Sequence, residues 1–172
     1  MFPFGVAGRI RVPCPDDPAA ACAETVLRKL ERMLDDARAR TVERRGHVLD
    51  FTAGLLRPVW NTNVLFAFVS GDIAVEAADR EVRVSYRAST VQLLVLHSLM
   101  LLFMEVVSLP RAGSTTRHAD WDAQLTVLGL VAAVFCLNYL IGLIRFRGWL
   151  KRGARQAIAD TRKKSLQVAD LG

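Results

Sequence analysis

The sequence predicts an α+β domain fused to a two-helix transmembrane hairpin and a basic amphipathic C-terminal helix. Two long apolar runs, Val91 to Leu109 and Leu125 to Ile144, predict the hairpin, because about 20 apolar helical residues cross a hydrocarbon core of about 30 Å. Helix-like and strand-like patterns before them predict the domain. The 172 residues thus divide into a domain (1–88), a first membrane helix (89–109), an external loop (110–123), a second membrane helix (124–144) and a tail (145–172).

The domain is expected to begin with a strand and a long helix. Phe4 to Val12 alternates loosely and contains β-branched residues, which favours a strand. From Ala19 to Ala37 apolar residues recur every three or four positions, which predicts an amphipathic helix. Asp16 or Asp17 is expected to cap its N-terminus, and Pro18 suits the first turn.

The rest of the domain predicts a largely antiparallel meander. His47 to Thr52 has the composition of a short strand. Val64 to Tyr86 alternates with period two, and turn residues at 70–72 and 78–80 divide it into three strands. The expected domain therefore has about five strands and one long helix.

An irregular segment from Gly54 to Asn63 contains several large apolar side chains close together. They need a partner, either under the edge of the sheet or on a membrane or another subunit. The residues of this possible docking patch are Leu55, Leu56, Val59 and Trp60.

Charge is distributed unevenly along the chain and predicts the orientation. Residues 1–88 hold 13 Lys or Arg against 12 Asp or Glu, whereas residues 145–172 hold 8 against 2. Cations close to membrane helices are retained in the cytoplasm, so both termini are expected there. The domain is nearly neutral, which argues against nucleic-acid binding. Trp121 and Trp149 bracket the second apolar run and are expected at the membrane interfaces.

The tail can form an amphipathic helix. Its apolar stripe leaves Lys151, Arg152 and Arg155 on the other side. Two positions are open for this helix: on the membrane, with its cations toward anionic headgroups, or packed on the domain of the same chain.

Polar residues interrupt the apolar runs. His97 and Glu105 share one face of the first predicted membrane helix, and a folded hairpin brings His97 to about the depth of Asn138. Ionisable groups inside a membrane are costly and often mark ion or proton paths. A structural role is the alternative, because two helices alone enclose no pathway.

The residues that carry chemistry in other proteins form no recognisable motif here. The three cysteines have neither a disulfide framework nor a zinc-site spacing, which suits a reducing compartment. Cys14 lies just ahead of a predicted helix start, where a thiol pKa can fall, so it is the one possible nucleophile. Neither a cofactor nor a metal is expected, and the sequence indicates no catalytic residue.

The expected function is therefore non-enzymatic. The sequence predicts a bacterial inner-membrane protein whose hairpin anchors a cytoplasmic interaction or scaffolding domain, as an accessory subunit of a larger assembly. Its expected partners are the bilayer, anionic headgroups along the tail, and another membrane protein or further copies of the chain. An oligomeric ion or proton pathway through His97, Glu105 and Asn138 is the first alternative, and a membrane-tethered enzyme using Cys14 is the second.

Overall fold

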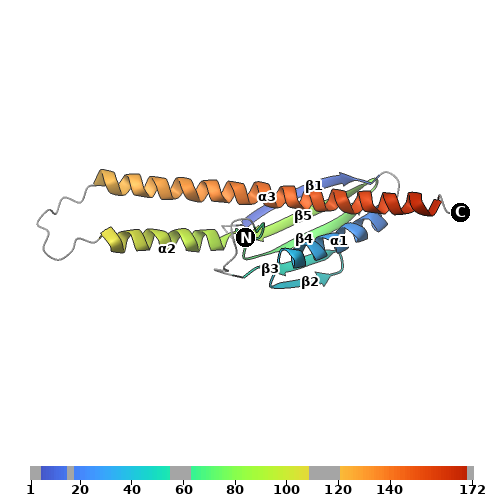
Figure 1. Cartoon of the computed structure of the whole chain (residues 1–172), viewed down its shortest axis with the longest axis horizontal. Coiled ribbons are helices and arrows are strands. Elements are labelled where there is room, and N and C mark those ends of the chain that lie inside the picture. Colours follow the sequence, from blue (N-terminus) through green and yellow to red (C-terminus); the bar gives the residue numbers. More distant parts are fainter. Residues whose placement is uncertain (1–4, 15–17, 55–62, 109–120, 170–172) are drawn as a thin grey trace, which may run out of the picture.

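A five-stranded antiparallel sheet and a very long C-terminal helix dominate the fold (Figure 1). The computed structural model describes residues 5–14, 18–54, 63–108 and 121–169. Its elements follow the order β1 (Gly5–Pro13), α1 (Ala19–Asp36), β2 (Thr41–Arg45), β3 (Val48–Thr52), β4 (Ser70–Ala78), β5 (Glu81–Ser89), α2 (Val91–Ser108) and α3 (Trp121–Ala169). The predicted α+β class is confirmed.

The strands lie in the order β1-β5-β4-β3-β2, and every neighbouring pair is antiparallel. Strands β2 to β5 form a meander. Strand β1 lies at the edge of the sheet beside β5, and the pairing runs from Gly5 opposite Ser89 to Pro13 opposite Glu81. Alternation places one side chain in two on each face of the sheet. The chain therefore builds one apolar face and one polar face.

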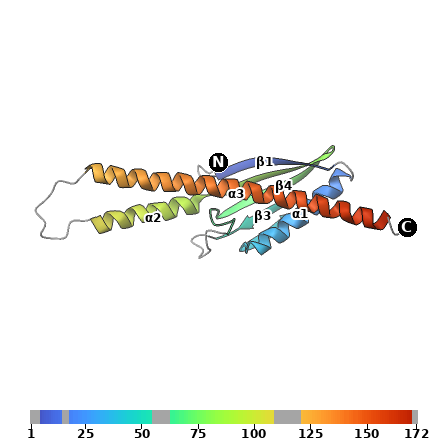
Figure 2. The ribbon, with the colours of Figure 1, turned by 45° about the horizontal axis from the view of Figure 1, so that its top comes forward.

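Helix α1 and the C-terminal half of α3 cover the apolar face (Figures 1 and 2). Each helix contributes a stripe at helical spacing, as expected for a helix that buries one side. The buried residues are Cys22, Val26, Leu27, Leu30 and Leu34 of α1 and Phe146, Leu150, Ala154 and Ala157 of α3. They meet the inward side chains of four strands and form one continuous core.

Two details of the predicted meander are wrong. Residues 64–67, expected as a strand, form a turn, in which Phe66 N–H donates to Asn63 C=O at 3.1 Å. The Asn63 side chain holds this turn by accepting from Leu65 N–H and by donating to Ala37 C=O, both at 2.9 Å. Residues 70–72, expected as a turn, open β4. The fifth strand is β2, which the sequence did not indicate because its residues are mostly exposed.

The ends of α1 differ from expectation as well. Asp16 and Asp17, the expected caps, lie outside the described residues. Pro18 precedes the first turn, and its carbonyl accepts from Ala21 N–H at 2.8 Å and from Cys22 N–H at 3.2 Å. At the other end Arg38 adopts a φ of 58°, a left-handed conformation that stops the helix and turns the chain toward β2.

Helix α3 is continuous over 49 residues, although the sequence predicted a membrane helix to residue 144 followed by a separate tail helix. Gly148 and Gly153 have low helix propensity, yet both lie inside the helix. An added Cβ at Gly153 would meet the thioether of Met33, so this glycine allows α3 to approach α1 closely. Tertiary contact therefore outweighs the low helix propensity of glycine.

Candidate membrane hairpin and its junction with the domain

Helix α2 and the N-terminal half of α3 extend together from one end of the sheet (Figures 1 and 2). β5 leads into α2 after a single intervening residue, Thr90, so the chain leaves the sheet almost without a linker. Among the described residues, one helix is long and apolar enough to cross a membrane, and it is the Leu128–Lys163 region of α3.

The side chains on the outside of these two helices are apolar and exposed. In water such a surface would be unfavourable, because exposed apolar patches on soluble proteins rarely exceed a few hundred Å². The exposed large residues are Leu99, Met100 and Leu102 of α2 and Leu128, Leu130, Val134, Leu137, Leu140, Ile141 and Ile144 of α3. In the described part of the chain, no protein element covers them.

This exposed apolar surface ends abruptly within α3. Ile144 is 69% exposed, whereas Phe146, only two positions later, is 0% exposed. Arg145 lies between them and Arg147 follows, and both are exposed. Ile144 and Phe146 lie about 200° apart around the helix, so the exposed side of α3 changes here from apolar to cationic while its other side packs on the domain.

Phe146 lies at the centre of an aromatic cluster inside the domain. Its ring centroid is 4.7 Å from that of Phe68, 5.4 Å from Tyr86 and 6.2 Å from Phe51. The Tyr86 contact is edge-to-face, a preferred geometry for aromatic pairs. Burial raises the pKa of the Tyr86 hydroxyl, and the nearby Arg147 opposes this shift.

The apolar stripe of the tail is thus occupied by the domain, which resolves the two positions open from the sequence. Trp149 stacks on Phe146 with centroids 5.9 Å apart and is half-buried. Lys151, Arg152 and Arg155 are exposed on the outer side of α3. Over residues 145–163, whose side chains the structure describes, the tail helix consequently has no free apolar face to place in a lipid interface.

His97 contacts α3 through an aromatic ring. Its imidazole lies edge-to-face against Phe135, with centroids 4.9 Å apart. Asn138, the partner expected from the sequence, lies three residues further along α3 and is half-buried. The side chains of Glu105 and Trp121 and the whole docking patch at 55–60 lie outside the described residues, as does most of the connector.

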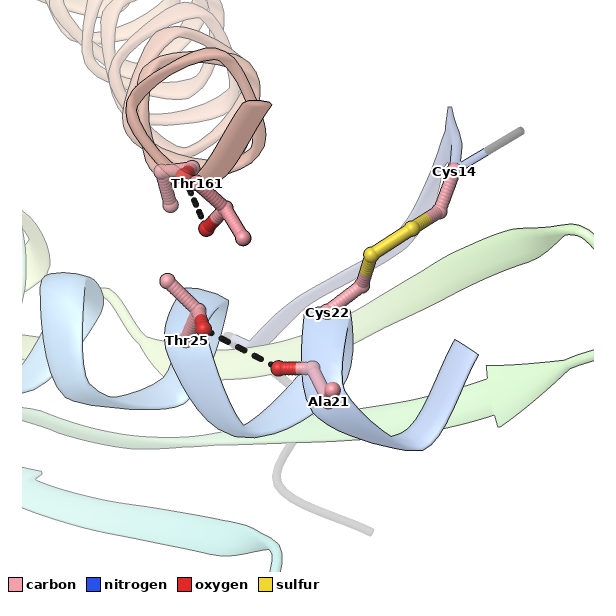
Figure 3. The surroundings of a disulfide bond; sticks show 6 residues. Cys14, Ala21, Cys22, Thr25 and Thr161 are labelled. Atoms are coloured by element: carbon pink, nitrogen blue, oxygen red, sulfur yellow. Dashed lines mark hydrogen bonds between the residues drawn. A yellow bond between two sulfur atoms is a disulfide. The ribbon is translucent and has the colours of Figure 1, made fainter. Parts of the chain in front are cut away.

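Cys14 and Cys22 form a disulfide, so the expectation of unpaired cysteines is wrong (Figure 3). Cys14 continues the inward alternation of β1, and Cys22 belongs to the buried stripe of α1, so both side chains enter the core at the same place. This shared inward position was a sequence signal for their proximity. The possible nucleophile Cys14 is 2% exposed and bonded, and it is not a free thiolate in this structure.

A surface groove of about 570 Å³ lies between α1, the β2–β3 turn and β4. Its apolar floor includes Leu27 and Val75, and an ion pair between Arg44 and Glu24, at 2.6 Å, lies on its wall. Arg44 and Glu24 therefore already form an ion pair within the chain. Among the described residues, no group of three or more His, Cys, Asp or Glu side chains is arranged to hold a metal ion.

No family model, no curated protein and no solved structure matches this chain. The role of the junction between the helices and the domain therefore has to be inferred from the geometry of this chain alone. The sequence placed Phe146 on the apolar stripe of the tail but left open whether lipid or the domain covers it, because the hydrophobic pattern continues without a break from the apolar run into the tail.

Proposed function

We propose that this chain is a non-enzymatic bacterial inner-membrane protein in which a two-helix hairpin anchors an interaction or scaffolding domain. The change along the exposed side of α3, from apolar residues that end at Ile144 to cations that begin at Arg145, carries the proposal. Before this boundary the exposed side needs an apolar environment that the described chain does not supply, and after it the exposed side is charged and suits water or lipid headgroups. A bilayer supplies such an environment.

The dimensions of the helices support insertion as a hairpin. Helix α2 has 18 residues, which corresponds to about 27 Å at a rise of 1.5 Å per residue. The apolar half of α3 has a similar length, and the hydrocarbon core of a bilayer is about 30 Å thick. Both helices leave the domain on the same side, so the two chain ends would share one side of the membrane.

Cations near the boundary support cytoplasmic termini. Arg145 and Arg147 lie within about 5 Å of the end of the apolar surface along the helix axis, and Lys151 and Arg152 within about 12 Å. The first two fall within the headgroup layer, where they would meet anionic lipids. The Cys14–Cys22 disulfide would favour an oxidising compartment for the domain. The charge of the segments beside the helices acts earlier, during insertion and before the domain has folded, so we give it more weight in assigning the orientation.

Site-specific labelling tests this topology. In a Cys136→Ser background, Ser114→Cys places a thiol in the connector and Ala159→Cys places one on the exposed side of the tail. An impermeant maleimide added outside intact inner membranes should label the first variant and spare the second. Labelling of both from one side would exclude a hairpin that crosses the membrane, and the reverse pattern would invert the orientation.

The scaffolding role requires a partner for the domain. We expect cross-linking in intact membranes to capture the protein in a defined complex with a membrane protein or with further copies of itself. A protein that remains monomeric and uncross-linked under these conditions would contradict the role while leaving membrane insertion intact.

An ion or proton pathway is the second candidate, because the half-buried His97 lies against α3 near Asn138 within the apolar half of the molecule. Flux through reconstituted liposomes tests it. If the protein conducts and His97→Ala leaves the flux unchanged, His97 does not line the pathway.

A further inference from the structure

The face of the sheet opposite α1 and α3 is uncovered in the described part of the chain. Every fully buried strand residue belongs to the covered face. The uncovered face carries the alternate positions, which are half-buried or exposed. The anchoring role leaves this face unused.

Strand register arranges this open face in rows across the sheet. In one row Arg87 of β5 lies opposite Asp72 of β4, and Asp72 lies opposite Asp50 of β3. Two residues further from the hairpin, the row contains Ser85 and Ala74. The next row places Arg83 opposite Glu76. Two charged rows therefore flank the small side chains of Ser85 and Ala74 on β5 and β4, and Arg9 and Val48 continue this middle row on β1 and β3.

The charges are partly segregated across the face. Most arginines lie on β1 and β5, namely Arg9, Arg11, Arg83 and Arg87, and most acids lie on β3 and β4, namely Asp50, Asp72 and Glu76. Two of these groups already have partners within the chain: Arg83 pairs with Glu81 at 2.8 Å, and Asp50 pairs with Arg45 at 3.3 Å. Directly opposed like charges, such as Asp50 and Asp72, are unfavourable in an isolated sheet. Partial burial raises the pKa of the Asp72 carboxyl, Arg87 lowers it, and Asp50 raises it further. Asp72 would gain from another cation.

We propose that a second copy of this chain packs on the open face, sheet against sheet, around a twofold axis parallel to the strands between β4 and β5. This axis brings Arg87 of one copy over Asp72 of the other, and Arg83 over Glu76. The small residues Ser85 and Ala74 then face each other and let the sheets approach. A twofold interface uses the same patch on both copies, so each favourable pair occurs twice.

Membrane insertion permits this arrangement, and to that extent the inference rests on the proposed function. The strands run along the same direction as the hairpin in both views (Figures 1 and 2). A twofold axis parallel to them would lie along the membrane normal, so both hairpins would enter one bilayer with the same orientation. Pairing two copies antiparallel through the free edge of β1 would instead point the hairpins in opposite directions.

The available area suits a dimer whose subunits are confined to a membrane. The four strands that face their counterparts across this axis, β1, β3, β4 and β5, give a face of about 500 Å² per copy at a strand spacing of about 4.8 Å. Two such faces bury about 1,000 Å², the size of a weak interface. Confinement of both copies to one bilayer raises their effective concentration and so favours association.

Charge reversal between copies tests the dimer. Arg87→Glu alone and Asp72→Arg alone should each weaken self-association of the full-length protein in lipid nanodiscs or mild detergent by about tenfold or more. Differently tagged copies, one with each substitution, should associate with each other when co-expressed. Restoration between different chains cannot arise from the Arg87–Asp72 pair within a chain. Arg32→Glu, on the exposed side of α1, is the matched control and should leave association unchanged.

Cross-linking tests the same interface without a charge reversal, so it remains informative if a reversed charge disturbs folding. Copies carrying Ala74→Cys, mixed with copies carrying Ser85→Cys, should form a covalent dimer with a short bis-maleimide in a Cys136→Ser background, because stacked sheets lie about 10 Å apart and a direct disulfide spans less. The dimer would be overturned if the correctly inserted protein stays monomeric. It would also be overturned if neither charge reversal changes self-association and no cross-link forms. The maleimide topology of the hairpin would be unaffected by that result, so the two failures are distinguishable.

Discussion

Gly142 of α3 lies directly against Ala67 in the turn that precedes β4. A Cβ added at Gly142 would lie 2.8 Å from the Cβ of Ala67, closer than two carbon atoms can pack without a shift. Ala67 has no flexible side chain that can move aside. The turn at 64–67 and α3 therefore meet at a contact that only glycine satisfies, close to the proposed membrane boundary.

Substitution of this glycine should destabilise the domain. We expect Gly142→Ala to lower the free energy of unfolding by about 1 kcal/mol, because overpacking costs about 1–3 kcal/mol and the gain in helix propensity returns only about 1 kcal/mol. Gly148→Ala is the matched control: nothing lies within 4 Å of a Cβ there, so propensity alone should stabilise the helix. Denaturant unfolding in mild detergent, followed by circular dichroism, measures both. Equal stabilisation by the two alanines would disprove the close contact.

Truncation of Phe146 should be far more damaging than truncation of its neighbour Ile144. Phe146→Ala removes a fully buried ring from contact with Phe51, Phe68 and Tyr86, and such changes cost about 3–5 kcal/mol. Ile144→Ala removes a side chain that is 69% exposed and should hardly change domain unfolding in detergent. The milder Phe146→Leu keeps the comparison measurable if the alanine variant does not fold. Similar losses at positions 144 and 146 would contradict the assignment of the covered and exposed sides of α3.

The ion pair between α1 and β2 should make stability depend on pH in the acidic range. Hydrogen bonds from Arg44 and Arg28 hold the pKa of the Glu24 carboxyl below its ordinary value of 4.5. The unfolded chain therefore takes up this proton first, and the contribution of Glu24 is complete above pH 4.5 and is lost as the pH falls through the folded pKa.

Glu24→Gln measures this contribution. The unfolding midpoints of the variant and the original protein should differ at neutral pH and converge in acid. Asp35→Asn, an exposed carboxylate on the same helix, provides the control for a lost negative charge. A midpoint difference for Glu24→Gln that is constant from pH 7 to pH 3 would show that the ion pair is not its source.

Thiol counting should report both the disulfide and the compartment of the domain. In protein purified in air, the Cys14–Cys22 bond leaves Cys136 as the one free thiol, so denaturation and alkylation without reductant should modify one cysteine of three. Reductant should raise the number to three. Alkylation inside intact cells should already modify three if the domain is cytoplasmic, because reducing compartments keep thiols reduced. One modified cysteine under that condition would place the domain in an oxidising compartment.

Local patterns were sufficient for the helix at 19–36 and for the strands that alternate regularly. Cys22, Val26 and Leu30 recur on one helical face, and Val82, Val84 and Tyr86 alternate on one strand face, so burial follows from the chain itself. The edge strand β2 and the turn at 64–67 escaped prediction. Thr41–Arg45 belongs to the sheet through its pairing with β3, and the turn is held by Asn63 reaching Ala37, a partner 26 residues away.

The sequence by itself determined the α+β class, the apolar surface that favours a membrane and the charge that favours cytoplasmic termini, because composition and periodicity are local properties. Tertiary structure alone decided that the basic tail belongs to the core of the domain, that α3 continues through two glycines, and that Cys14 meets Cys22. Each of these depends on which surface lies opposite. An apolar stripe signals that a helix must be covered, but lipid and protein satisfy it equally until the fold places one of them against it.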